Sequence, residues 1–297
     1  MSHKRVVVMG ATGMLGHILV KKLDKYENID LFATARSPKK LHQIFKPDFL
    51  DRVFVNIDAD NFESIAHTVE EIQPDVIINC IGIIKQLPLA HDSIASISIN
   101  ALFPHKLAAI CQSIGARFIH ISTDCVFKGD KGTYTEDTPV DATDLYGRTK
   151  FLGEVSASNC ITLRTSLIGH ELNTKYALID WFLSQEEKVR GFTNAIYTGF
   201  PTVEMARIIA DYVIPNPDLS GLYNVSSDLI SKNDLLCLVA KQYNKKIEIE
   251  PYDDFFCDRS LDSTRFRTET GYSPPSWEEL VKSMHEDFIR DIRNYNS

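Results

Sequence analysis

The sequence predicts an α/β protein built on an open parallel β-sheet, and two observations support that fold class. Short apolar segments rich in valine and isoleucine alternate with segments of helical periodicity through the first half of the chain. Such alternation indicates βαβ units, which wind a parallel sheet with helices on both faces. The apolar segments also end in glycine or polar residues, as strands do where an open α/β sheet binds its ligands.

Six segments have the composition and length of buried strands: 4–9, 30–35, 52–57, 76–80, 117–122 and 161–165. Helices are expected between them at 61–72 and at 93–114, the latter with a bend at Pro104. Later the alternation weakens, and the pattern predicts strands at 222–225 and 246–250 and helices at 176–187, 203–212, 232–243 and 277–292. A chain of 297 residues is near the upper limit for one core. We therefore expect a large lobe at 1–165 and a smaller α/β lobe mainly at 166–297, with some later segments returning to the first.

Composition excludes several classes of function. The net charge of −8, a pI near 5.6 and the lack of a basic run argue against a nucleic-acid partner. No signal peptide precedes the first strand, and we expect no apolar run approaching the ~18 residues of a membrane span, which predicts a cytoplasmic protein without a membrane partner. The six cysteines and nine histidines are scattered without metal-ligand spacing, so we expect reduced thiols and no metal.

The first strand ends in a glycine-rich turn that leads into a helix: Gly10-Ala11-Thr12-Gly13-Met14-Leu15-Gly16. Backbone amides of such a turn bind the diphosphate of a dinucleotide at the helix N-terminus. The alternative is a tight turn that needs glycine only for positive φ. The turn lacks the Gly-Lys-Ser/Thr ending of a P-loop, and the chain has no G-x-S-x-G hydrolase motif. Its position after the first strand favours a Rossmann-type dinucleotide site.

The ends of the next two strands bear on the choice of cofactor. Arg36 follows the second strand, where an acid would bind the ribose of NAD and an arginine can bind the 2′-phosphate of NADP. Because no acid stands there, we predict NADPH, with NADH as a weaker alternative; the competing interpretation of Arg36 is a solvated loop arginine. Asp58 and Ala59 follow the third strand, where the adenine would lie, although helix capping together with Asp60 and Asn61 accounts for Asp58 equally well.

The fourth strand opens onto a loop whose glycine permits close approach of a cofactor. The residues assigned to the cofactor here are Cys80, Ile81 and Gly82. Lys85, farther along the loop, would project from the carboxyl edge of the sheet and contact substrate, or lie in solvent.

Tyr146 and Lys150 stand one helical turn apart on one face of a helix that follows the fifth strand. A tyrosine pKa is about 10, and a nearby lysine cation lowers it by favouring the phenolate. The pair can then act as a general acid toward a carbonyl oxygen. An ordinary amphipathic helix with an exposed lysine is the competing interpretation. The fifth strand brings three further polar residues to the same edge of the sheet: Thr123, Asp124 and Cys125.

These residues together resemble the extended short-chain dehydrogenase/reductase superfamily. The glycine motif at 10–16, Ile-Asn-Cys-Ile-Gly at 78–82, Ser-Thr-Asp at 122–124 and the Tyr146/Lys150 pair occur in that family's order. Over nearly its whole length the chain is similar to the dTDP-4-dehydrorhamnose reductase-like branch. The segments that carry this narrower resemblance are 122–129, 146–154, 163–166, 199–202, 220–225, 259–263 and 277–279.

The resemblance implies NADPH-dependent reduction of a nucleotide-linked 4-keto-6-deoxy sugar for surface polysaccharide or O-antigen synthesis. It implies that Thr123 hydrogen-bonds the substrate carbonyl, Tyr146 donates the proton and Lys150 also holds the nicotinamide ribose. Asn100 would anchor a water relay, with a buried capping asparagine as the alternative. Arg164 and Arg259 are the candidates for the diphosphate of the sugar nucleotide, since a guanidinium matches phosphate geometry. Relatives are often dimers, so a homodimer is also expected.

Cys125 departs from the branch, which has tyrosine there, and from related 4,6-dehydratases, which have glutamate. The missing glutamate argues against elimination, and the missing tyrosine leaves a UDP-linked N-acetylated 4-ketosugar open as the substrate. Two other functions stay open as well. One is an epimerase or dehydratase that keeps NAD bound; the other is a non-catalytic NADP-binding regulatory subunit, like the regulator of methionine adenosyltransferase in this branch.

Overall fold

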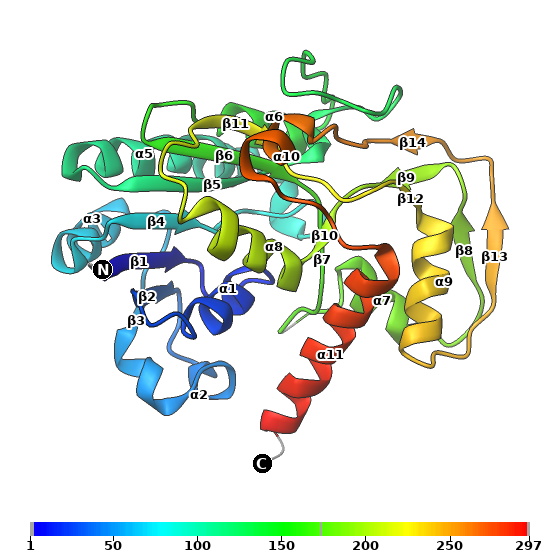
Figure 1. The fold of residues 1–297 in the computed structure, drawn as a ribbon, viewed down its shortest axis with the longest axis horizontal. Helices are drawn as coiled ribbons and strands as arrows, with labels where there is room; N and C mark the ends of the chain where they lie inside the picture. The colour runs from blue at the N-terminus through cyan, green and yellow to red at the C-terminus, as the bar shows by residue number, and fades with distance from the viewer. Residues whose placement is uncertain (1–2, 173, 296–297) are drawn as a thin grey trace.

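A seven-stranded parallel sheet is the largest element of the computed structural model, which describes residues 3–172 and 174–295 (Figure 1). The strand order is β11-β6-β5-β4-β1-β2-β3. The chain therefore starts in the middle of the sheet, winds outward to β3, and then returns to build the other half from β4. This is the doubly wound, Rossmann-type topology, so the predicted fold class is confirmed.

The strands of this sheet are β1 (Lys4–Met9), β2 (Ile29–Ala35), β3 (Val53–Val55), β4 (Val76–Asn79), β5 (Arg117–Thr123), β6 (Cys160–Thr165) and β11 (Gly221–Asn224). The six strands expected before residue 165 are all present, the third of them shortened. Its first residue belongs instead to the 3-10 helix η1 (Pro47–Arg52). β11 pairs in parallel with β6, so a segment of the C-terminal half completes the large sheet.

Helices cover both faces of the sheet because successive strand residues point to opposite sides (Figure 1). Val7, Ile77 and Phe118 face α3 (Phe62–Ile72) and α5 (Phe103–Ile114). The other face packs against α1 (Gly16–Leu23), α8 (Thr202–Ile208) and α11 (Trp277–Tyr295). Helix α8 continues directly as the π-helical η5 (Ile209–Val213).

The helix expected over 93–114 changes its hydrogen-bonding pattern along its length. It consists of α4 (Ser93–Ser96), the π-helical η3 (Ile97–Leu102) and α5. Pro104 is the second residue of α5, but η3 runs into α5 without a break, so the proline removes a backbone donor inside a continuous helix. The irregularity is therefore the π-helical segment before Pro104.

The same helix corrects one prediction about apolar runs. Its 22 residues, with a mean hydropathy of 1.4, are long and apolar enough to cross a membrane. Core helices of soluble proteins pass the same test, and 39 % of the apolar stretch is buried in this fold. Length and composition therefore argue only weakly for a membrane span here.

The smaller lobe consists of short strands around a few helices (Figure 1). β12 (Ile230–Ser231), β9 (Ala195–Tyr197) and β14 (Cys257–Asp258) form one sheet, β13 (Ile249–Tyr252) pairs with β8 (Val189–Phe192), and β10 (Phe200–Pro201) pairs with β7 (Leu167–Ile168). The helices are α7 (Leu178–Ser184), α9 (Lys232–Gln242) and α10 (Thr264–Thr270), of which α7 and α9 were predicted. Most of these strands were not, because two to four residues are too few to show periodicity.

Candidate active site

Helix α6 (Leu145–Leu152) carries Tyr146 and Lys150, and local contacts determine where it begins and how closely it packs. The Asp144 carboxylate caps the helix by accepting from the Gly147 N–H at 2.8 Å. A Cβ at Gly147 would lie 2.2 Å from the Cys125 carbonyl oxygen. Glycine is therefore needed for α6 to approach the turn η4 (Asp124–Val126) at the end of β5.

This close approach brings together the three residues predicted to act on a substrate carbonyl. The Thr123 side chain lies near enough to the Tyr146 hydroxyl to act on the pKa of the phenol. Thr123 Oγ1 also donates to Asp124 Oδ1 and accepts from the Cys125 N–H, each at 3.1 Å. Lys150 lies one turn farther along α6, and its Nζ donates to the Ile121 carbonyl at 2.8 Å. A hydroxyl pair and an ammonium thus lie at the carboxyl edge of β5.

The pKa of Tyr146 is raised well above its usual value, which contradicts the predicted lowering by Lys150. Burial of the phenol is the main cause, and the neighbouring Cys125, Asp124 and Asp144 add to the rise, while the Thr123 side chain acts against it. Burial outweighs the attraction that a lysine exerts on a phenolate. Tyr146 is therefore protonated at neutral pH, as a proton donor must be.

Lys150 has the opposite shift. Only 6 % of the residue is exposed, and burial lowers the pKa of its ammonium to about 8. Glu154 and Cys80 act against that lowering. Glu154 was not singled out from the sequence, although it follows Lys150 by four residues and so continues the helical spacing of Tyr146 and Lys150.

The glycine-rich turn has the geometry of a diphosphate cradle. Gly10 has a φ of +79°, and the Gly13 N–H bonds the Gly10 carbonyl at 3.0 Å. Beyond its chain neighbours, a Cβ at Gly13 would meet no protein atom closer than the Gly10 oxygen at 3.4 Å, so packing alone does not require glycine there. An open backbone at the start of α1 is what close approach of a diphosphate needs.

Arg36 and Asp58 follow β2 and β3, as predicted. The Arg36 side chain is exposed and forms no hydrogen bond or ion pair with another described residue, so it is free to bind a phosphate. Asp58 Oδ1 accepts from the Asp60 N–H at 3.2 Å, and Asn61 caps α3. The carboxylate of Asp58 thus has the local turn role that competed with adenine binding.

The loop after β4 is held by side chains that were predicted to serve ligands. Asn100 hydrogen-bonds both backbone groups of Ile83: its Oδ1 accepts from the Ile83 N–H at 2.8 Å, and its Nδ2 donates to the Ile83 carbonyl at 3.0 Å. Lys85 Nζ lies 2.8 Å from Asp144 Oδ2, which joins the loop to the N-cap of α6. The buried-cap alternative for Asn100 therefore describes its side chain.

Arg164 does not lie where the predicted diphosphate role would place it. It is 2 % exposed, and its Nε and Nη2 each donate to Glu154 at 2.7 Å. Burial and pairing with Glu154 argue against the diphosphate role, although Arg164 Nη1 has no partner among the described residues. Arg259 is partly exposed and does lie beside the site: Nε donates to the Phe127 carbonyl at 2.8 Å, and Nη1 is 4.0 Å from Cys125 Sγ.

Comparison with known proteins agrees with this geometry. The family model of the RmlD substrate binding domain matches residues 4–290. The chain belongs to the RmlD substrate binding domain family. The match covers both lobes and confirms the resemblance that the motifs indicated.

Individual members of the RmlD family differ in their named functions. The chain is 26 % identical to the spore coat polysaccharide biosynthesis protein SpsK of Bacillus subtilis, over 95 % of this chain and 97 % of that protein. It is 25 % identical to methionine adenosyltransferase 2 subunit beta of Danio rerio, over 82 % and 75 % of the two chains. In fold it is similar to dTDP-4-dehydrorhamnose reductase of Bacillus anthracis, solved in complex with NADP, with a TM-score of 0.78, 22 % identity and coverage of 97 % and 99 %.

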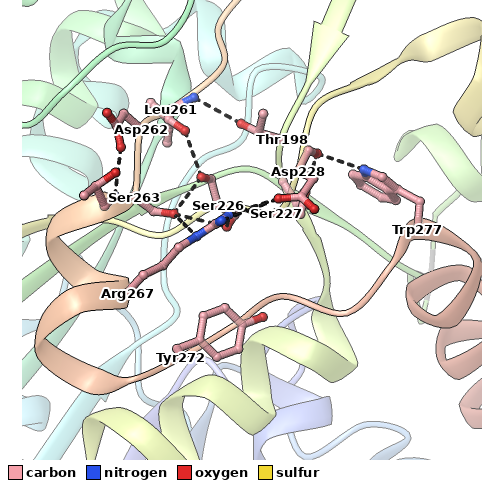
Figure 2. A network of polar contacts seen from close by, with 12 residues as sticks. Thr198, Ser226, Ser227, Asp228, Leu261, Asp262, Ser263, Arg267, Tyr272 and Trp277 are labelled. Carbon is pink, nitrogen blue, oxygen red and sulfur yellow. Dashed lines mark hydrogen bonds and ion pairs between the residues drawn. The ribbon is translucent and has the colours of Figure 1, made fainter.

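The segment 259–263, one of those that carry the resemblance, takes part in the polar network that Figure 2 shows. Arg267 Nε donates to Ser263 Oγ at 2.9 Å, and its Nη2 donates to the Ser226 carbonyl at 3.0 Å. The Leu261 N–H donates to Thr198 Oγ1 at 3.1 Å. This network holds the segment 261–263 against 226–228, and Arg259 lies two residues before it, next to Cys125.

Proposed function

We propose that this protein uses NADPH to reduce the 4-keto group of a nucleotide-linked 4-keto-6-deoxy sugar for surface polysaccharide synthesis. The observation that carries the proposal is the Thr123–Tyr146 hydroxyl pair at the carboxyl edge of the sheet, with Lys150 one turn away. Family membership and the open glycine-rich turn support it. The proposal includes a cytoplasmic location and a homodimer, both expected from the sequence.

Each residue of the candidate site has its own role in the proposed reduction. Thr123 and Tyr146 direct two hydroxyls at one carbonyl oxygen, and Tyr146, which is protonated at neutral pH, donates its proton there. Both side chains thereby stabilise the charge that develops on that oxygen. The glycine-rich turn at 10–16 would hold the diphosphate of NADPH and the Arg36 guanidinium its 2′-phosphate, and the cofactor would supply hydride to the carbonyl carbon. The Lys150 ammonium holds the nicotinamide ribose.

Cys125 and Arg259 bear on the identity of the sugar nucleotide. Arg259 is the guanidinium left to bind the substrate diphosphate, because Arg164 is paired with Glu154. Cys125 lies between Arg259 and Tyr146, and burial raises the pKa of its thiol to about 12, so it is neutral. A neutral thiol cannot replace the glutamate of a dehydratase. It leaves both a dTDP-linked sugar and a UDP-linked N-acetylated 4-ketosugar as substrates.

A panel of dTDP- and UDP-linked 4-ketosugars, incubated with NADPH deuterated at the transferring position, tests the proposal. Mass spectrometry is expected to show a product with two more hydrogens, one of them deuterium. Label in a free small ketone but in none of the sugar nucleotides would overturn the substrate class. Copurified, non-exchanging NAD would instead favour an epimerase or dehydratase.

The similarity to methionine adenosyltransferase 2 subunit beta favours a second candidate, a non-catalytic NADP-binding subunit. That candidate predicts NADPH binding without turnover of any sugar nucleotide in the same panel. Retention of Thr123 at the end of β5 and of Tyr146 and Lys150 on α6 supports the reductase over it.

A further inference from the structure

We propose that Glu154 is a positioning residue for this reaction: its carboxylate keeps Lys150 charged and holds helix α6 in place on the sheet. The inference rests on the proposed function, in which the Lys150 ammonium acts beside Tyr146. It assigns a role to a buried acid that the mechanism above does not use.

Two neighbouring strands hold the Glu154 carboxylate. Ser122 of β5 and Arg164 of β6 are direct partners in the parallel register, so their side chains lie side by side. Ser122 Oγ donates to Glu154 Oε1 at 2.7 Å, and the Arg164 guanidinium donates to both carboxylate oxygens at 2.7 Å. Three hydrogen bonds therefore leave the carboxylate little freedom to move.

Adjacent residues of β5 hold the Glu154 carboxylate and Lys150, and the two charges interact without a direct ion pair in the described part of the chain. Lys150 Nζ bonds the carbonyl of Ile121, and Glu154 bonds the side chain of Ser122, the next residue of β5. Both groups come from one segment, four residues apart. The end of α6 is thus attached to β5 by a cation and an anion at adjacent positions.

The other titratable groups near Lys150 cannot supply a negative charge. Burial raises the pKa of the Cys80 thiol to about 12, so it is neutral. His120 of β5 is buried, and burial together with the charges of Lys150 and His105 holds its pKa well below the usual value, so it is neutral too. Its Nδ1 lies 3.2 Å from Asn79 Nδ2, and its Nε2 has no partner among the described residues. Arg164 adds a positive charge that is already paired with Glu154.

These neighbours make Glu154 the group on which the charge of Lys150 depends. Burial lowers the pKa of Lys150 to about 8, so the amine loses its proton as the pH rises through that value. Removing the Glu154 charge lowers the pKa further, because an opposite charge nearby typically shifts a pKa by about 1–3 units. Lys150 would then be largely neutral at pH 7.5.

The Glu154→Gln variant tests this through the pH dependence of kcat/KM and of the NADPH Kd. In the wild type, activity and NADPH affinity should fall as the pH rises through about 8. In Glu154→Gln the same fall should move to lower pH by about one unit or more, with activity recovering near pH 6. Glu154→Asp, which retains the charge, should return the fall toward its wild-type position. A purely structural role would lower activity equally at every pH.

Glu204 of α8 provides a matched control, because Arg207 Nε and Nη2 donate to its carboxylate oxygens at 2.9 and 2.7 Å. Glu204→Gln should lower the unfolding midpoint and leave the pH profile unchanged. If Glu154→Gln folds poorly, Arg164→Gln provides the opposite test: it removes the cation paired with Glu154, so the fall should move to higher pH. An unshifted profile in folded Glu154 variants overturns the inference. A wild type that binds NADPH but reduces no sugar would refute the proposed function alone, and the Kd profile would still decide the role of Glu154.

Discussion

Two glutamate–arginine pairs of the same geometry hold helical segments in this protein, and their surroundings differ. Arg164 donates through Nε and Nη2 to the Glu154 carboxylate just after α6, and Arg207 donates through the same two nitrogens to the Glu204 carboxylate on α8. Glu154 lies beside Lys150, whereas Glu204 also accepts from the Tyr272 hydroxyl at 2.8 Å. A buried ion pair therefore does not by itself identify a functional site. The residues around the pair show whether it belongs to one.

The contrast extends to the regions around the pairs. Near α6, polar groups converge on a point where a carbonyl oxygen can be bound. Near α8, the Arg207 guanidinium lies over the rings of Tyr212 and Tyr272, and Tyr26 bonds Asp211. The second region joins helices to one another through these contacts.

The largest effect is expected from two tyrosines. Tyr146→Phe keeps the ring but removes the proton donor, so turnover should fall by about 10²–10⁴-fold while NADPH affinity is kept. Tyr272→Phe removes a hydrogen bond to Glu204, so it should cost about 1.5–3 kcal/mol of unfolding free energy and leave kcat unchanged. Steady-state kinetics and urea unfolding measure the two. Near-normal turnover in Tyr146→Phe would show that the proposed acid is wrong.

Two glycines provide the next contrast. Gly147→Ala places a Cβ against the Cys125 carbonyl and must push α6 away, so kcat should fall by about 10²-fold. At Gly115, φ is +71° and no atom lies within 4 Å of the added Cβ. Gly115→Ala should therefore cost only the left-handed backbone, about 1 kcal/mol, without a change in kcat. Equal kcat values in the two variants would contradict the close packing of α6 as a requirement for turnover.

Cofactor choice should respond to Arg36 and not to a neighbouring cation. Loss of a charge-assisted contact to the 2′-phosphate costs ~1.5–3 kcal/mol, so Arg36→Ala should reduce the preference for NADPH over NADH by about tenfold to a hundredfold. Lys39→Ala, three residues farther along the same exposed loop, should leave the preference intact. Fluorescence titration of both cofactors gives the ratio. An unchanged ratio in Arg36→Ala would remove Arg36 from the cofactor site.

The smallest effect is expected at Arg259. Arg259→Lys keeps the charge but loses the planar fork that bonds Phe127 and faces Cys125, so KM for the sugar nucleotide should rise about tenfold. Arg190→Lys changes an exposed guanidinium stacked on Tyr252 and should leave KM unchanged. NADPH affinity serves as the internal control. A KM that responds equally to both changes would place the substrate elsewhere.

The sequence by itself determined the doubly wound sheet and the approximate position of the site. Strand composition, helical periodicity, the turn at 10–16 and the spacing of Tyr146 and Lys150 are local properties, readable from residues a few positions apart. Because the carboxyl ends of parallel strands meet at one edge, local order also placed Thr123 near Tyr146. The short strands of the smaller lobe carried too little periodicity to be found.

Only the tertiary structure decided what several of the predicted side chains bind. The Asn100 amide hydrogen-bonds the backbone of Ile83, and Lys85 pairs with Asp144, 59 residues farther along the chain. Arg164 is buried and paired with Glu154. It also reversed the expected shift in the pKa of Tyr146, because burial outweighs a nearby cation. Hydrogen-bond partners and burial depend on segments that meet only when the sheet and its helices pack, so residue spacing along the chain does not encode them.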